Sequence, residues 1–159
     1  MRLLFVCLGN ICRSPTAEGV MAALITNAGL SATISVDSAG TGAWHVGELA
    51  DPRTRAAAQR RGIALTHRAR QVTVEDLTAF DYIVAMDRAN RDGLQRLALA
   101  AACQARIVLL RNYELSASVD AEVPDPYCGT EGDFDNVLDI CQRACAGLLA
   151  HLQAQLPTR

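Results

Sequence analysis

A cysteine and an arginine near the N-terminus are spaced so that one short loop could hold both. Five residues separate Cys7 from Arg13 in the run Cys-Leu-Gly-Asn-Ile-Cys-Arg-Ser. If backbone N–H groups point into this loop at a helix N-terminus, the loop can hold a dianionic phosphate. The same positive field stabilises a thiolate, so Cys7 is a candidate nucleophile. Arg13 is a candidate to hold two phosphate oxygens through its planar fork while the phosphorus becomes five-coordinate.

The segments on either side of this loop predict a strand before it and a helix after it. Leu3 to Val6 is an unbroken apolar run, typical of a strand buried on both faces. Ser14-Pro15 predicts a helix start with Ser14 as the cap, and Ser14 is also placed to donate a hydrogen bond to the Cys7 sulfur. Gly9 and Asn10 tolerate the left-handed backbone that such a loop demands.

The alternative is that Cys7 is an inert buried thiol and Arg13 a surface residue beside an ordinary turn. The strand before the loop and the Ser-Pro pair after it favour the catalytic interpretation.

Composition excludes several classes of function. The net charge of −2 gives no reason to expect a nucleic acid partner. All 15 basic residues are arginine, which excludes a lysine Schiff base and the lysine of a nucleotide-binding P-loop. No apolar run approaches the ~20 residues of a membrane span, and the apolar stretch after Met1-Arg2 is too short for a secretion signal. We therefore expect one cytoplasmic domain over residues 1–159.

The six cysteines predict reduced thiols, because the chain carries no export signal. No Cys-x2-Cys or His-x3-His pair is present, so we expect neither a metal site nor a cofactor. Cys141 and Cys145 lie on an apolar helical stripe and should pack in the core, and Cys103 should be structural as well. Cys12 lies in the loop with Cys7, and it is either a redox partner for Cys7 or a small residue that fits there.

Four apolar runs alternate with helical patterns, which predicts an α/β fold. The expected strands are 3–7, 33–37, 81–86 and 105–110, and the expected helices are 14–29, 52–61, 88–101 and 133–155, with a short helix at most over 74–77. This alternation indicates a single doubly wound domain with a four-stranded parallel sheet in the order 2-1-3-4 and helices on both faces.

Right-handed crossovers place the carboxyl ends of all four strands at one edge of the sheet. Cys7, Ser38, Asp87 and Arg111 each follow an expected strand, so we expect them to surround one crevice. The long connection over 111–132 leaves from the same edge.

Thiolate attack on a phosphate ester needs a proton donor for the leaving group, on the opposite side of the phosphorus. The long connection offers Asp120, Glu122 and Asp125, of which only Asp125 lies between two prolines. From the residues alone, a turn role for Asp125 is favoured over an acid role.

Several segments together resemble the low-molecular-weight protein tyrosine phosphatases. The run from Cys7 to Glu18 is similar to the signature loop of that family. The blocks 37–41, 69–72, 80–87 and 125–127 resemble further family blocks in the same order, so that the resemblance covers essentially the whole chain. It implies hydrolysis of phosphotyrosine through a cysteinyl-phosphate, with Cys7 as nucleophile, Arg13 as phosphate ligand and Asp125 as acid and then base.

The resemblance also implies roles for residues around the loop. It assigns phosphate binding to Leu8, Gly9, Asn10, Ile11, Cys12 and Ser14. It makes Trp44 and Tyr127 walls for the flat phosphotyrosine ring, although Trp44 could instead cover a small satellite core. Members similar to arginine-phosphate phosphatases carry Thr at the position of Ile11, so Ile11 favours phosphotyrosine.

The resemblance implies two further residues as supports for the loop, and the position of Asp87 makes it a third candidate. Ser38 matches a family position that bonds to Asn10, and His67 matches a histidine that supports the same network. Without the resemblance, a lone loop histidine is more often a surface residue. Asp87 could orient Arg13 or cap the helix that follows it.

Two other functions remain open alternatives. An arsenate reductase of the same fold needs a pair of redox cysteines shortly after the third strand, where this chain has only Cys103. A phosphate-binding module without turnover is the second. The expected partners of a phosphatase are phosphotyrosine proteins, with a cognate tyrosine kinase as a candidate by analogy with bacterial members.

Overall fold

The computed structural model describes residues 1–101 and 103–157, so the last two residues of the predicted domain lie outside it. Its elements in chain order are β1 (Arg2–Cys7), α1 (Arg13–Asn27), β2 (Ser35–Gly40), α2 (Pro52–Arg60), α3 (Asp76–Ala79), β3 (Tyr82–Ala85), α4 (Arg88–Leu99), β4 (Arg106–Leu109), the 3-10 helix η1 (Leu110–Tyr113) and α5 (Glu131–Gln153).

The four strands form one parallel sheet in the order β2-β1-β3-β4, which confirms the predicted topology. β1 lies in the interior of this sheet, where Val6 pairs with Ala39 of β2 and with Ala85 of β3. The residues Leu3 to Val6 are fully buried, as their unbroken apolar run predicts.

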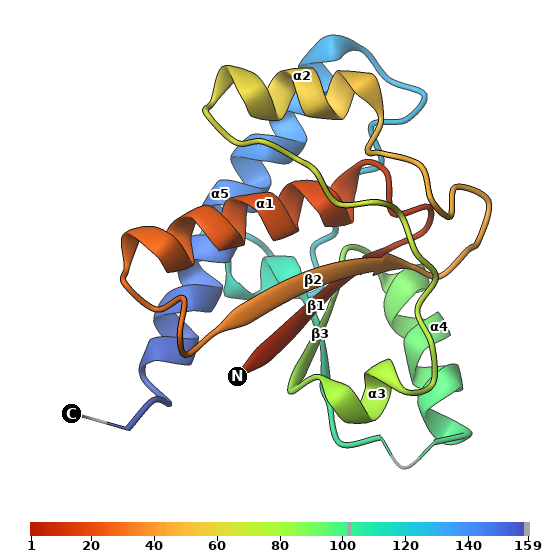
Figure 1. The fold of residues 1–159 in the computed structure, drawn as a ribbon, viewed down its shortest axis with the longest axis vertical. Coiled ribbons are helices and arrows are strands. Elements are labelled where there is room, and N and C mark those ends of the chain that lie inside the picture. Colours follow the sequence, from red (N-terminus) through yellow and green to blue (C-terminus); the bar gives the residue numbers. More distant parts are fainter. Residues whose placement is uncertain (102, 158–159) are drawn as a thin grey trace.

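Helices cover both faces of the sheet (Figure 1). Because side chains alternate along a strand, Leu3 and Phe5 pack with α1, α2 and α5, whereas Leu4 and Val6 pack with α3 and α4. Cys141 and Cys145 on α5 are fully buried in the first of these cores, as predicted. Among the residues that the structure describes, none of the helices is both long enough and apolar enough to cross a membrane.

β2 begins and ends later than the predicted strand 33–37, which places Ser38 inside the strand rather than after it. The pairs Phe5–Ser38 and Cys7–Gly40 continue the ladder to the end of β1. A Cβ at Gly40 would lie 2.8 Å from the carbonyl oxygen of Leu8. The last residues of β2 are therefore small because the loop after β1 passes close to them.

The start of α1 also differs from the prediction. Cys12 is the N-cap residue, without a side-chain cap, and the helix begins at Arg13. Ser14 is not the cap, because its hydroxyl faces the Cys7 sulfur instead. Pro15 is the third helical residue rather than the first, a position whose N–H has no intrahelical partner either.

The other helix boundaries differ from the expected ones by a few residues at most, and their caps explain most of the differences. α2 begins at Pro52 as predicted, with Asp51 accepting a hydrogen bond from the Arg53 amide. α5 begins at Glu131 rather than at residue 133, because Thr130 and Asp133 form a reciprocal cap.

Candidate active site

The loop between β1 and α1 has the left-handed residue that the sequence predicts at Asn10, whose φ is 56°. The same expectation for Gly9 is wrong, since Gly9 does not adopt a left-handed φ. A Cβ at Gly9 would instead lie 3.2 Å from the His45 ring, so Gly9 makes room for that side chain.

The Cys7 sulfur lies at the base of this loop with the Ser14 hydroxyl 3.0 Å away. The Asn10 side-chain amide donates to the Ser14 oxygen at 2.9 Å. Because that oxygen already accepts a bond from Asn10, its own hydrogen is free to be donated, and the Cys7 sulfur at 3.0 Å is nearer than the other acceptor in reach, the Ala39 carbonyl at 3.4 Å. The N-terminus of α1 adds the partial positive charge of its unpaired N–H groups. Both effects stabilise negative charge on the sulfur.

Arg13 is buried at the other end of the loop and faces two carboxylates. One guanidinium nitrogen donates to Asp87 at 2.6 Å and the other donates to Asp125 at 3.2 Å. Burial lowers the pKa of Arg13, but the negative charges of Cys7, Asp87 and Asp125 outweigh it and raise the pKa above its ordinary value. The guanidinium is therefore positively charged and can bind a phosphate anion.

Asp87 fills both of the roles that the sequence left open. Besides its bond to Arg13, its carboxylate accepts a 2.7 Å hydrogen bond from the backbone N–H of Asn90 and caps α4. The cap fixes the carboxylate, and the carboxylate fixes Arg13.

Asp125 combines the turn role and a place at the site. One carboxylate oxygen accepts a 3.1 Å bond from the Tyr127 amide, and the other faces Arg13. Its side chain is 46% exposed, so it remains accessible to solvent and substrate.

One cavity of about 180 Å³ brings together most of the predicted residues. It is lined by Cys7, Leu8, Gly9, Ile11, Cys12, Arg13, Trp44, His45, Asp125 and Tyr127. Trp44 is 72% exposed, which means that it does not cover a satellite core. Gly42 leaves space for this ring, because a Cβ there would overlap it.

Ser38, Asp87 and Arg111 do not line this cavity, contrary to the expectation that they surround one crevice with Cys7. Ser38 lies behind the loop and accepts a 2.9 Å bond from Asn10. Arg111 donates to the Glu122 carbonyl at 2.9 Å, so it holds the connection that carries Asp125.

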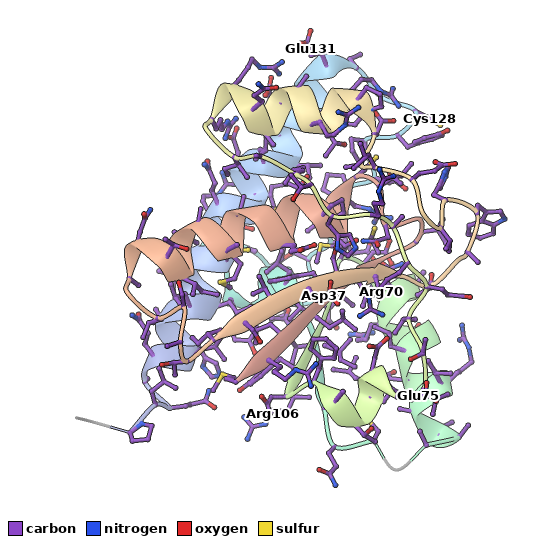
Figure 2. The ribbon with its side chains drawn as sticks, viewed as in Figure 1. Asp37, Arg70, Glu75, Arg106, Cys128 and Glu131 are labelled. Carbon is purple, nitrogen blue, oxygen red and sulfur yellow. The ribbon has the colours of Figure 1, made fainter. Side chains whose placement is uncertain are left out.

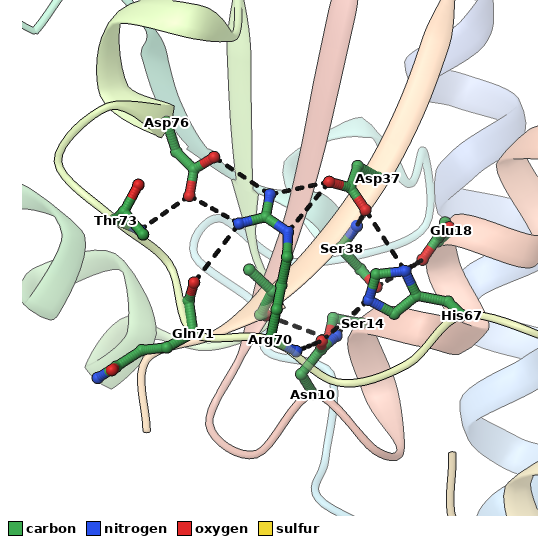
Figure 3. A network of polar contacts seen from close by, with 11 residues as sticks. Asn10, Ser14, Glu18, Asp37, Ser38, His67, Arg70, Gln71, Thr73 and Asp76 are labelled. Atoms are coloured by element: carbon green, nitrogen blue, oxygen red, sulfur yellow. Dashed lines mark hydrogen bonds and ion pairs between the residues drawn. The ribbon is translucent and has the colours of Figure 1, made fainter. Parts of the chain in front are cut away.

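A polar network behind the loop contains His67, as the resemblance implies (Figure 3). The side-chain oxygen of Asn10 lies 3.2 Å from the Nε2 atom of His67 and accepts a 2.9 Å bond from the Arg70 amide. Burial raises the pKa of Glu18, whose carboxylate accepts a 2.5 Å bond from Ser38.

Arg70 and Glu114 are support residues that sequence reasoning missed. The Arg70 guanidinium pairs with Asp37 at 2.8 Å and with Asp76 at 2.9 Å, and Figure 2 shows Arg70 beside Asp37. Glu114 is 5% exposed and accepts 2.7 Å bonds from Arg111 and Arg143. Burial alone would raise the pKa of Glu114, but these two arginines hold it below its ordinary value.

Cys12 is a buried neighbour of the nucleophile candidate. Burial raises its pKa from 9.0 to about 12, so it is a neutral thiol near pH 7. Cys12 is therefore not a second nucleophile, because the thiolate is the reactive form of cysteine.

Comparison with known proteins identifies the family. Residues 2–158 match the family model described as low molecular weight phosphotyrosine protein phosphatase. A low molecular weight protein-tyrosine-phosphatase of Streptomyces coelicolor is 44% identical over 99% of this chain and 97% of its own length.

Two solved structures are similar over nearly the whole chain. A protein tyrosine phosphatase of Entamoeba histolytica superposes with a TM-score of 0.90 and 40% identity, covering 98% of both chains. A drosophila arginine phosphatase superposes with a TM-score of 0.91 and 32% identity, covering 96% of this chain and 98% of that one. The chain belongs to the low molecular weight phosphotyrosine protein phosphatase family, and it is a protein-tyrosine phosphatase, a phosphoric monoester hydrolase.

Proposed function

We propose that Cys7, Arg13 and Asp125 carry out phosphotyrosine hydrolysis in two steps. The Cys7 thiolate attacks the phosphorus, the bond from phosphorus to the phenolic oxygen breaks, and Asp125 gives its proton to the departing oxygen. Asp125 then takes a proton from water, which attacks the cysteinyl-phosphate and releases phosphate and the Cys7 thiolate. The single observation that carries this proposal is that the three side chains line one cavity.

The loop and Arg13 stabilise the charge that this reaction moves. The equatorial phosphate oxygens gain hydrogen bonds from the loop amides and from the fork of Arg13. Asp87 and Asp125 already hold the two terminal nitrogens of that fork. A phosphate bound to the fork competes with Asp125 for the terminal nitrogen that contacts it, and a carboxyl displaced from Arg13 is free for proton transfer.

The walls of the cavity support a flat aromatic substrate. Trp44 and Tyr127 lie in its lining together with Ile11, which is 7% exposed. The likeness to the drosophila arginine phosphatase makes phosphoarginine a second candidate substrate. The apolar side chain of Ile11 favours the phosphotyrosine ring over a charged guanidinium.

The arsenate reductase alternative has weaker support. Cys103 bonds to the Ala105 carbonyl just before β4, at the end of the strands away from Cys7. A disulfide relay needs thiols that reach the Cys7 sulfur. Arsenate reduction coupled to thioredoxin would revive this alternative.

We further propose the setting in which the enzyme acts. The phosphatase domain spans residues 1–159, which the family match to residues 2–158 supports. The enzyme acts in the cytoplasm, which the six free cysteines support. Its substrates are proteins phosphorylated by a cognate tyrosine kinase. Capture of phosphoproteins by an Asp125→Ala variant, followed by their identification, tests the kinase partner.

The catalytic assignment is tested with a colorimetric aryl phosphate in the presence of EDTA. We expect full turnover by the natural chain, none by Cys7→Ser, and normal turnover by Cys128→Ser, which removes an exposed thiol instead. Turnover by Cys7→Ser would refute the assignment. A burst of phenol without steady turnover by the natural chain would support the binding module instead.

A further inference from the structure

Three side chains behind the phosphate loop converge from different parts of the chain (Figure 3). Glu18 lies on α1, Asp37 on β2, and His67 between α2 and α3. One possible ligand atom from each lies within 4.8 Å of the other two. None of the three lines the candidate active site.

The distances from His67 to the two carboxylates are close to those between the ligands of a zinc ion. The Nδ1 atom of His67 lies 3.5 Å from an Asp37 oxygen and 3.7 Å from a Glu18 oxygen. Ligands of a tetrahedral zinc ion with bonds of about 2.0–2.1 Å lie about 3.3 Å from one another. The two distances to His67 exceed this value by a few tenths of an ångström, and the Glu18 and Asp37 oxygens lie within 4.8 Å of one another, so small side-chain movements would close the set around an ion. Imidazole with two carboxylates is a donor set that zinc uses.

The three side chains keep enough exposure for a further ligand. Those of Glu18, Asp37 and His67 are 19%, 34% and 18% exposed. A water molecule can therefore complete the coordination of a bound ion.

Residues outside the set orient each of the three side chains. Arg70 holds one oxygen of Asp37 at 2.8 Å and leaves the other facing His67. Ser38 donates to the Glu18 oxygen. The Nε2 atom of His67 lies 3.2 Å from the Asn10 side-chain oxygen. With Nδ1 on a metal, Nε2 carries the ring hydrogen and donates it to Asn10, as metal-bound histidines commonly do to a neighbouring acceptor.

The charges in this network also favour a divalent cation. When ionised, Glu18, Asp37 and Asp76 carry three negative charges, and the Arg70 guanidinium that binds the two aspartates carries one positive charge. With His67 neutral, as a metal ligand must be, the sum is −2. One divalent ion balances that sum.

We propose that Glu18, Asp37 and His67 bind one divalent transition metal ion of the zinc type. The ion stabilises the phosphate loop through the bond from His67 to Asn10, and it takes no part in the proposed chemistry at Cys7. Spacing motifs cannot find such a site, because its ligands come together only when α1, β2 and the segment after α2 pack.

Binding is measured by calorimetric titration of Zn²⁺ into a Cys7→Ser chain, which lacks the thiolate at the active site. We expect one equivalent to bind, and the affinity to fall more than about tenfold when His67→Asn or Glu18→Gln is added. Glu75→Gln, which changes an exposed carboxyl (Figure 2), should leave the affinity unchanged. Circular dichroism spectra identical to that of the parent chain verify that the variants are folded.

A second readout uses Co²⁺ on the natural chain and does not depend on any variant. We expect weak visible bands typical of nitrogen and oxygen ligands, without charge transfer from a thiolate. The proposal is overturned if the Cys7→Ser chain binds no Zn²⁺, if folded His67 and Glu18 variants bind it as tightly, or if Co²⁺ shows thiolate ligation alone. The cluster would then be an ion-pair support only. Neither result depends on phosphatase activity, so the proposed function is tested separately.

Discussion

The two sides of the candidate active site are built in different ways. On the phosphate side, Cys7, Asn10 and Ser14 are almost fully buried and bound to one another between β1 and α1. On the acid side, Asp125 is 46% exposed and lies in a connection without regular structure from 114 to 130. The residues proposed to hold the phosphate are thus buried and bonded to one another, whereas the carboxyl proposed to transfer protons is exposed and contacts Arg13 at 3.2 Å.

Contacts from several elements hold the connection that carries Asp125: the Val123 amide donates to the Met86 carbonyl at 2.8 Å, and Arg88 bonds to the Glu122 carboxylate at 2.9 Å. Arg111 bonds to the Glu122 carbonyl, and Glu114 holds Arg111 and Arg143. Changes to the buried groups proposed to bind phosphate should therefore nearly abolish the reaction, and changes on the acid side should slow it.

Arg13→Lys should have the largest effect of the four changes considered next. Lysine keeps the charge but loses the planar fork that spans two phosphate oxygens. We expect kcat for an aryl phosphate to fall by about 10³-fold or more, in the range of arginine residues that stabilise phosphoryl transfer. Steady-state kinetics measure it, and a loss of less than about tenfold would contradict the assigned role.

Asp125→Asn should have a smaller effect that varies with the substrate. Loss of a general acid costs about 10²–10⁴-fold, and the cost shrinks when the leaving group needs no proton. We expect a severe loss of kcat with phosphotyrosine and a much milder loss with an activated aryl phosphate. Equal losses with both substrates would show that Asp125 does not protonate the leaving group.

Glu114→Gln should destabilise the acid side while leaving the phosphate side intact. The change leaves Arg111 and Arg143 without their shared carboxylate, which we expect to cost roughly 1–3 kcal/mol in the free energy of unfolding. Activity should fall through kcat with little change in KM, because Glu114 acts on the position of Asp125. Chemical denaturation and kinetics of the folded variant measure the two effects.

The pH dependence of the Glu114 effect follows from its lowered pKa. A carboxyl whose folded pKa lies below its ordinary value of 4.5 stabilises the fold above that pH and loses the contribution as the pH falls through the folded value. The stability difference between the natural chain and Glu114→Gln should be full at pH 7 and shrink below about pH 4.5. A difference that grows in acid would contradict this sign.

Ile11→Thr should have the smallest effect on the rate and the clearest effect on selectivity. It replaces an apolar group in the cavity lining with a smaller polar one. We expect roughly a tenfold loss in kcat/KM for phosphotyrosine relative to phosphoarginine, in line with the loss of one apolar contact. An unchanged ratio would remove Ile11 from the substrate pocket.

The phosphate side was predictable from the sequence because its parts are local. The apolar run 3–6, the left-handed Asn10 and the spacing from Cys7 to Arg13 all lie within one short segment. The continuation of β2 through Ser38 was not predictable, since small polar residues carry no strand signal. Residues 38–40 belong to the strand because β1 pairs with them, and they are small because the loop after β1 passes close to them.

The residues that support the site were harder to predict, because their partners come from distant parts of the chain. Arg70 belongs to an arginine-rich stretch typical of a solvated surface, yet it pairs with Asp37 on β2 and with Asp76. Glu114 looks like an ordinary loop residue until α5 brings Arg143 to it. His67 was found only through the family resemblance, because nothing local marks its partner Asn10.

The cysteinyl-phosphate is the central claim, and rapid acid quenching during turnover of a radiolabelled aryl phosphate tests it most directly. Peptide mapping should place the label on the Cys7 sulfur. With an activated aryl phosphate, whose leaving group needs no proton, the amount should rise when Asp125→Ala slows hydrolysis of the intermediate. Label on any other residue, or none while phenol is released in a burst, would contradict the account.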